Sequence, residues 1–202
     1  MRQATRDLDP PVRHFTSFEK GEVAAMLRRG KIGVLLTDTI YGVVGSALNK
    51  RTVERIYRLK GRNKKKPFIV LVSRYDDIHK FGVKLSRTEK KRICDMWGSR
   101  PTSVIFPVPS KKFSYLDRGT DAIALRMPGT KAGSDLRRLL RASGPLVAPS
   151  ANPEGQLPAT NIEEAMDYFG QKVDFYVDGG RKKGRPSRLV TLKDGTLKVL
   201  RP

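Results

Sequence analysis

Residues 32–48 read Ile-Gly-Val-Leu-Leu-Thr-Asp-Thr-Ile-Tyr-Gly-Val-Val-Gly-Ser-Ala-Leu. The apolar run Ile32–Leu36 is typical of a short buried strand, and Tyr41–Leu48 reads as a second extended segment. Between them lies the polar run Thr37–Thr39, which offers two hydroxyls and a carboxylate directly after a buried strand. An ordinary turn held by side-chain hydrogen bonds would use the same residues. The stretch therefore predicts a sheet and, at its edge, a candidate site.

The remaining chain alternates strand-like and helix-like runs, which favours a single α/β or α+β domain. Short buried strands of Val, Ile and Leu between helices indicate a sheet that helices cover, and such sheets bind ligands where loops leave the strand ends. Thr16–Glu19 and Ser86–Glu89 match the capping box that opens a helix. The predicted helices are 16–30, 49–61, 86–97 and 160–169; the further predicted strands are 68–72, 103–108, 122–127 and 146–148, followed by a hairpin over 188–200 that turns at Asp194-Gly195.

The composition excludes several kinds of protein. At 202 residues the chain suits one domain, which at this length buries roughly 70% of the surface that its unfolded chain exposes. No run of about 18 apolar residues is present, so we expect no membrane span, and the first residues lack the apolar stretch of a secretory signal. The single cysteine, Cys94, excludes an internal disulfide framework and fits a reducing cytoplasm, where we expect the protein to act.

The chain is strongly basic. It has 41 Lys and Arg against 20 Asp and Glu, which gives a formal net charge of +21. Such a surface attracts nucleic acid, nucleotides or anionic membranes, but general basicity or solubility would give the same excess.

Residues 59–67, Leu-Lys-Gly-Arg-Asn-Lys-Lys-Lys-Pro, join a predicted helix end to a predicted strand. Lys60 and Arg62 are two residues apart, so in an extended segment they would point the same way. Such a pair can bind separate oxygens of a triphosphate. The alternative is a solvated run of cations that complements the dipole at the helix C-terminus. The glycine-rich pattern of a P-loop is absent.

Two further loops combine small, polar and basic residues. Residues 145–155 carry a buried strand into the turn Ser150-Ala151-Asn152, which prolines on both sides stiffen. Residues 179–187, Gly-Gly-Arg-Lys-Lys-Gly-Arg-Pro-Ser, are typical of a phosphate-binding loop or an RNA contact. Taken alone, the first is also compatible with a plain rigid turn and the second with a flexible basic loop.

In their order and spacing, these segments resemble the YrdC/TsaC family of threonylcarbamoyl-adenylate synthases over about residues 17–202. The family pattern is a P-T-[ED]-T-x-Y-G-L-like loop, then K-x-R, then S-x-N, then a late serine and a terminal L-R-P, and it also has a W-P-G-P-[LV]-T segment and an A-[VL]-R segment. The matching residues are Thr37–Gly42, Lys60–Arg62, Ala124–Arg126, Ser150–Asn152, Ser187 and Leu200–Pro202, with a looser match at Trp97–Ser103. Departures from the pattern fall at Leu36, at the Gly98–Arg100 loop and at Arg188.

The resemblance implies a twisted mixed sheet with helices around a positively charged concave cavity. We expect this YrdC-like domain over residues 16–202, after an N-terminal arm of residues 1–15. By the same resemblance, ATP would be held by Lys60, Arg62, Ser150, Asn152 and Arg201, and threonine by Thr37, Arg126 and Ser187. Lys64 and Lys66 are further candidates for contact with phosphate. The resemblance implies no side-chain nucleophile and no protein ligand to a metal.

The implied activity is the synthesis of threonylcarbamoyl-AMP and pyrophosphate from L-threonine, bicarbonate or carbon dioxide, and ATP with Mg²⁺. Its product would serve the threonylcarbamoyladenosine modification of tRNA. The implied partners are tRNA or double-stranded RNA and the proteins that transfer the threonylcarbamoyl group to tRNA, with no membrane. The alternative is a YciO-like paralogue that binds double-stranded RNA or tRNA without full synthase activity.

Overall fold

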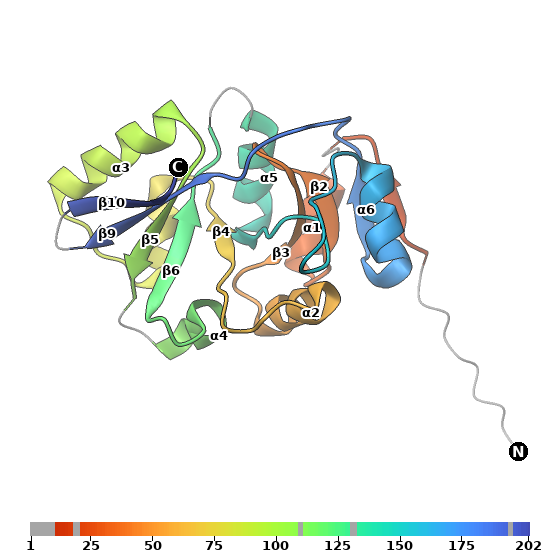
Figure 1. The fold of residues 1–202 in the computed structure, drawn as a ribbon, viewed down its shortest axis with the longest axis horizontal. Helices are drawn as coiled ribbons and strands as arrows, with labels where there is room; N and C mark the ends of the chain where they lie inside the picture. Colours follow the sequence, from red (N-terminus) through yellow and green to blue (C-terminus); the bar gives the residue numbers. More distant parts are fainter. Residues whose placement is uncertain (1–10, 18–20, 109–110, 130–132, 194–195) are drawn as a thin grey trace, which may run out of the picture.

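The computed structural model describes residues 11–17, 21–108, 111–129, 133–193 and 196–202, and all structural statements concern these. One ten-stranded sheet runs through them, with the strand order β1-β8-β2-β3-β7-β4-β6-β5-β9-β10. In Figure 1 this sheet spans the molecule from the β9–β10 hairpin on the left to the region of α6 on the right. The strands are β1 Arg13–Phe15, β2 Gly33–Leu36, β3 Tyr41–Ser46, β4 Ile69–Leu71, β5 Thr102–Pro107, β6 Ala122–Arg126, β7 Leu146–Val147, β8 Phe175–Val177, β9 Arg188–Lys193 and β10 Thr196–Arg201.

The pairing is mixed, as predicted. β2 pairs in parallel with β8 and antiparallel with β3, whereas β4 pairs in parallel with β6 and antiparallel with β7. The α-helices are α1 Glu22–Arg28, α2 Lys50–Lys60, α3 Arg87–Ser99, α4 Ser114–Asp117, α5 Ser134–Ser143 and α6 Ile162–Phe169; the 3-10 helices are η2 Tyr75–Phe81, η3 Lys111–Phe113 and η4 Gly170–Lys172. Within the described ranges, no helix combines the length and apolar character needed to cross a bilayer.

Local sequence fixes both ends of α2. The Asn49 side chain accepts a hydrogen bond from the Thr52 amide at 3.2 Å, and Gly61 ends the helix in the left-handed region at φ 59°. Glycine suits that position because it has no Cβ to clash there. Since α2 stops here, the cationic segment after it leaves the helix and turns toward the sheet. The predicted capping box of α3 is also present, between Ser86 and Glu89.

Two predicted helix starts differ from the structure. α6 is capped by Asn161, whose side chain accepts from the Glu164 amide at 2.9 Å, one residue after the predicted cap at Thr160. α1 begins at Glu22 after Gly21, and Phe18 and Glu19 of the predicted capping box lie outside the described residues. The turn Asp194-Gly195 also lies outside them, although β9 and β10 pair as the predicted hairpin.

Besides the short helix α4 and the 3-10 helices, three elements had no counterpart in the sequence prediction. Helix α5 lacks a side-chain cap, and the three-residue strand β8 gives too short an alternation to detect. Strand β1 pairs in parallel with β8, so the sheet includes Arg13–Phe15 from the predicted N-terminal arm.

One face of the sheet is covered unevenly. Along β4, β5, β6 and β9, alternate residues such as Val70, Val104, Leu125 and Val190 point into the large core shared with α2, α3 and α6. On the opposite face, α1 and α5 share a core cluster with residues of β1, β2, β3, β4, β7 and β8, and no residue of β5, β6 or β9 belongs to this cluster. The β6–β5–β9 part of that face is therefore left without a helix, and it forms the floor of the cavity described below.

Substituting Gly45 with alanine is expected to destabilise the fold. A Cβ at Gly45 would lie 2.5 Å from a Thr52 methyl and 3.0 Å from Ile56 of α2, and the packed core leaves neither room to move. Overpacking of this kind costs about 1–3 kcal/mol, measurable by urea denaturation. The control, Gly98→Ala on the exposed side of α3, has open space around its Cβ and should leave the protein as stable or more so. Equal stability of the two variants would contradict the packing seen here.

Candidate functional site

A cavity of about 440 Å³ opens above the uncovered part of the sheet. This size falls within the usual range for small-molecule sites. Among the described residues that line it, three are arginines and none is acidic. The lining residues are Thr37, Thr39, Ile40, Tyr41, Gly42, Arg62, Pro67, Phe68, Ile69, Ile105, Thr120, Ala122, Ala124, Arg126, Ala148, Pro149, Ser150, Pro158, Pro186, Ser187, Leu189 and Arg201.

The cavity brings together six of the ten predicted site residues. Thr37, Arg126 and Ser187, predicted to hold threonine, all line it. Of the residues predicted for ATP, Arg62, Ser150 and Arg201 line it; Lys60 and Asn152 do not, nor do the phosphate candidates Lys64 and Lys66. These assignments to ligands stay predictions, whereas the convergence of the six side chains is an observation.

The loop between β2 and β3 holds its polar residues in a fixed turn. The Thr37 hydroxyl donates to the Ile40 carbonyl at 2.6 Å and accepts from the amides of Thr39 and Ile40. The two threonine hydroxyls lie 3.0 Å apart. The sequence analysis gave a turn held by side-chain hydrogen bonds as the alternative to a candidate site. The structure shows that turn, and the same residues line the cavity, so the two interpretations are compatible.

Arg126 and Asp38 form a buried ion pair beside this turn. The Nη2 atom of Arg126 lies 3.0 Å from Oδ1 of Asp38, and their side chains are 5% and 1% exposed. Both carboxylate oxygens of Asp38 and the Nε atom of Arg126 lack hydrogen-bond partners among the described residues. The two charged groups are therefore close enough to form an ion pair, but their orientation does not form a hydrogen bond. Burial lowers the pKa of Arg126, Asp38 raises it, and the nearby charge of Arg201 lowers it. The arrangement leaves donor capacity on a buried guanidinium at the cavity wall.

The opposite wall is built from the C-terminal hairpin. Arg201 on β10 donates from Nε and Nη2 to the Ser187 carbonyl, at 3.2 and 2.8 Å. The Ser187 hydroxyl lies 2.8 Å from the hydroxyl of Ser103 on β5. β9 pairs in parallel with β5, and this places the C-terminal hairpin beside the cavity. Arg201 near the end of the chain therefore lines the same cavity as Thr37. Arg188, where the family pattern usually has a small hydroxyl, points its Nε to Thr102 Oγ1 at 3.3 Å and is absent from the cavity lining.

Lys60 and Arg62 lie in different surroundings, contrary to the prediction that an extended segment would point them the same way. Arg62 lines the cavity, with its guanidinium 5.4 Å from the centre of the Phe68 ring. Lys60 is still helical and only 2% exposed, and its ammonium donates to the backbone carbonyls of Ser150 and Asn152. Burial, together with the charge of Arg62, lowers the pKa of Lys60 to about 7, while Glu154 acts in the opposite direction.

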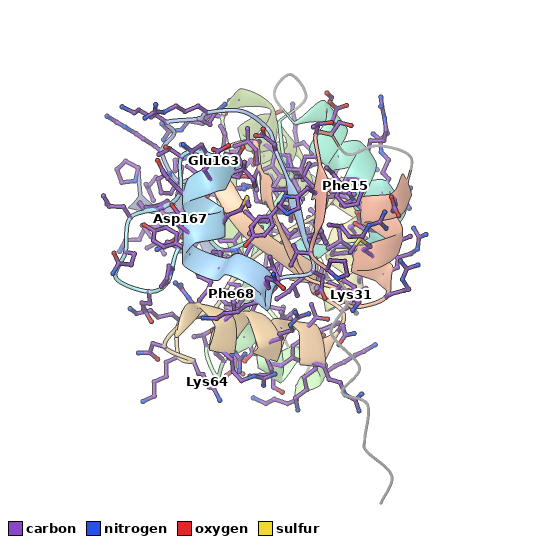
Figure 2. All side chains as sticks on the ribbon, turned by 90° about the vertical axis from the view of Figure 1, so that its right-hand side faces the viewer. Phe15, Lys31, Lys64, Phe68, Glu163 and Asp167 are labelled. Carbon is purple, nitrogen blue, oxygen red and sulfur yellow. The ribbon has the colours of Figure 1, made fainter. Side chains whose placement is uncertain are left out.

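The other two lysines of this segment face outward. Lys66 pairs with Glu154 at 2.7 Å, and that carboxylate also accepts from the Asn63 amide. Lys64 is exposed, and Figure 2 shows it at the outer edge of the molecule beside α2. Lys64 and Lys66 therefore fit the interpretation of this segment as a solvated run of cations, whereas Arg62 fits its interpretation as part of a binding site.

The sequence prediction missed the apolar floor of the cavity. Ile105, Ala122, Ala124 and Leu189 alternate with the core residues of β5, β6 and β9 and so face the opposite side of the sheet. The alternation along these strands could be recognised in the sequence. The sequence did not show which part of that face of the sheet lacks a covering helix. In the described part of the chain, no group of three or more His, Cys, Asp or Glu side chains could hold a metal ion.

Comparison with known proteins shows the family of this chain. Residues 25–202 match the Sua5/YciO/YrdC family model, which carries the description "Telomere recombination". The chain belongs to the YrdC/Sua5 family.

Relatives in this family are named threonylcarbamoyl-AMP synthases. The chain is 32% identical to the one from Thiobacillus denitrificans over 179 residues, covering 88% of the chain and 92% of the relative. It is 28% identical to that of Blochmanniella pennsylvanica, covering 92% and 95% respectively. The Pyrococcus abyssi synthase is 27% identical over 89% of the chain, but the chain spans only about half, 52%, of its length.

Solved structures of the family share the fold. Pyrococcus abyssi Sua5 in complex with L-threonine superposes with a TM-score of 0.83 at 26% identity, covering 96% of this chain and 57% of that one. Escherichia coli YciO superposes with a TM-score of 0.78 at 20% identity, covering 94% and 95%. At that identity the likeness to YciO shows the fold alone.

Removing the partner of the buried guanidinium is expected to destabilise this YrdC/Sua5-family protein strongly. Asp38→Asn leaves the charge of Arg126 uncompensated, and breaking one side of a buried ion pair costs about 3 kcal/mol or more. The free energy of unfolding in urea measures the loss. Asp135→Asn removes a carboxylate from an exposed pair with Arg138 and should change stability within error. A stable Asp38→Asn variant would show that the cavity wall does not depend on this pair.

Proposed function

We propose that the protein is a threonylcarbamoyl-AMP synthase. The observation that carries the proposal is the convergence of Arg62, Arg126 and Arg201, from three distant segments, on one cavity with the hydroxyl residues Thr37, Ser150 and Ser187. The printed names of the relatives and the threonine-bound Sua5 structure support it. We further propose that the protein acts in the cytoplasm and supplies proteins that modify tRNA.

The two ends of the cavity suit two different substrates. Arg126 and Ser187 offer a guanidinium and a hydroxyl to the carboxylate and polar groups of L-threonine, and Thr37, whose hydroxyl holds its own turn, shapes the same part of the cavity. Arg62, Arg201 and Ser150 are left to hold phosphate oxygens of ATP, and the apolar floor is free for uncharged parts of the ligands. Mg²⁺ would enter with ATP as the MgATP substrate, where it neutralises phosphate charge.

The proposed reaction needs orientation and charge stabilisation more than a reactive side chain. The threonine amine and bicarbonate combine to a carbamate with loss of water. A carbamate oxygen then forms a bond to the α-phosphorus of ATP, the bond from that phosphorus to the bridging oxygen breaks, and pyrophosphate leaves with the electron pair. Negative charge grows on the non-bridging and leaving oxygens, which fixed cations such as Arg62 stabilise. Positioning two substrates in one cavity supplies much of the remaining rate.

Pyrophosphate release should depend on both small substrates. We expect the protein with MgATP, L-threonine and bicarbonate to release pyrophosphate, and omission of either L-threonine or bicarbonate to abolish the release. A coupled phosphate assay after pyrophosphatase treatment measures it. Release without threonine would overturn the proposal. ATP binding without any release, together with salt-sensitive binding of double-stranded RNA, would favour the YciO-like alternative.

Loss of the cavity arginine should lower the rate. Arg62→Ala removes a preorganised cation, and we expect kcat/KM for pyrophosphate release to fall by roughly 10²–10³-fold, as is typical when an electrostatic donor is removed. Arg58→Ala, which removes an exposed arginine from the same helix end, provides the charge-matched control and should retain activity. Similar losses in both variants would mean that general basicity, and not the cavity, governs the rate.

A further inference from the structure

Lys60 lies behind the wall of the cavity, not on its surface. It is the last residue of α2, is 2% exposed and is absent from the cavity lining. Two of the three N–H donors of its ammonium are used by the carbonyls of Ser150 and Asn152. Ser150 itself lines the cavity, so the ammonium contacts the rear of a turn whose front faces the ligand space.

The turn depends on outside donors because prolines flank it. Pro149 and Pro153 have no N–H, which limits how the loop can satisfy its own carbonyls. Within the turn the Asn152 amide reaches the Ser150 carbonyl at 3.0 Å, and the Asn152 side chain donates to Pro153 and Gln156. The Lys60 ammonium supplies the donors that hold both ends of the three-residue turn at once.

The backbone strengthens the same attachment. The Glu154 amide donates to the Lys60 carbonyl at 2.8 Å, and the Ala151 amide donates to the Tyr41 carbonyl at 2.9 Å. The turn is thus held by α2 on one side and by β3 on the other. Since Arg62, two residues further on, already presents a cation to the cavity, anion binding does not require Lys60 as well.

We propose that Lys60 is a positioning residue, which fixes the Ser150–Asn152 turn through two backbone carbonyls and acts on the bound nucleotide only through Ser150. Its effect on turnover rests on the proposed synthase function, whereas its effect on the turn does not. Without the ammonium, the turn loses its rear support and the Ser150 hydroxyl loses its fixed place at the cavity wall.

A double-mutant cycle tests the route of this effect. We expect Lys60→Met and Ser150→Ala each to lower kcat/KM for pyrophosphate release, and the double variant to be no worse than about two-fold below Ser150→Ala. Residues that act as one unit give such non-additive losses, whereas independent phosphate contacts multiply. The cycle of Lys60→Met with Arg201→Ala is the control, since Arg201 belongs to the opposite wall, and its losses should multiply. Multiplied losses in the first cycle, or an unaffected Ser150→Ala variant, would overturn the proposal.

Salt dependence separates positioning from phosphate binding. A cation that contacts phosphate contributes to the fall of ATP affinity with rising salt. We expect Arg62→Ala to flatten the dependence of the ATP dissociation constant on salt and Lys60→Met to leave its slope unchanged. An equal flattening in Lys60→Met would assign Lys60 to the phosphates.

Hydrogen exchange in the unliganded protein tests the support itself and needs no activity. We expect Lys60→Gln to raise exchange at the amides of Ala151, Asn152 and Glu154 by at least ten-fold while the amides of β5 stay protected. Arg62→Ala should leave all of them unchanged. Unchanged exchange at the turn in a folded Lys60→Gln protein would overturn the proposal. If the wild-type protein releases no pyrophosphate, the synthase proposal fails, but this measurement still decides the role of Lys60.

Discussion

Helices α1 and α5 cover only part of one face of a ten-stranded sheet, and the site exists because of what they leave open. They pack against each other and against the β8–β2–β3–β7–β4 region, with Arg28 donating to the Ala142 carbonyl between them. The opposite face is covered by α2, α3 and α6. A sheet covered fully on both faces would have no hollow; here the open β6–β5–β9 region gives a floor, and loops at the strand ends give walls.

The walls come from segments far apart in the chain. The Thr37 turn follows β2, Arg126 ends β6, and Ser187 and Arg201 flank the final hairpin. Their internal hydrogen bonds hold the polar groups at fixed positions before any ligand arrives, which is the condition for electrostatic stabilisation without reorganisation. Arg126, which lines the cavity, is held there by its buried ion pair with Asp38 and keeps an unused N–H donor.

The two members of the K-x-R segment have different surroundings for a geometric reason. Lys60 still belongs to α2, Gly61 reverses the backbone at positive φ, and Arg62 starts the segment that leads to β4. Lys60 and Arg62 would share a face in an extended strand. Here Lys60 contacts the Ser150 carbonyl behind the cavity wall, whereas Arg62 lines the cavity. The same cationic motif supports the loop from behind and presents a charge to the cavity in front.

The sequence by itself determined most of the elements and predicted six of the polar residues that the structure brings to the cavity. The cap at Asn49 and the glycine at position 61 fixed α2, and the apolar runs at Ile32–Leu36 and Tyr41–Leu48 fixed the two strands around Thr37, because these signals act over a few residues. It did not assign β8, whose three residues are too few for a detectable alternation, or α5, which lacks a side-chain cap although its buried residues recur at helical spacing. Only the tertiary structure decided which face of β5, β6 and β9 stays open, because this depends on where α1 and α5 pack on the sheet. It alone also decided that Lys60 binds carbonyls instead of facing the cavity, because those contacts join residues 90 and 92 positions apart in the chain.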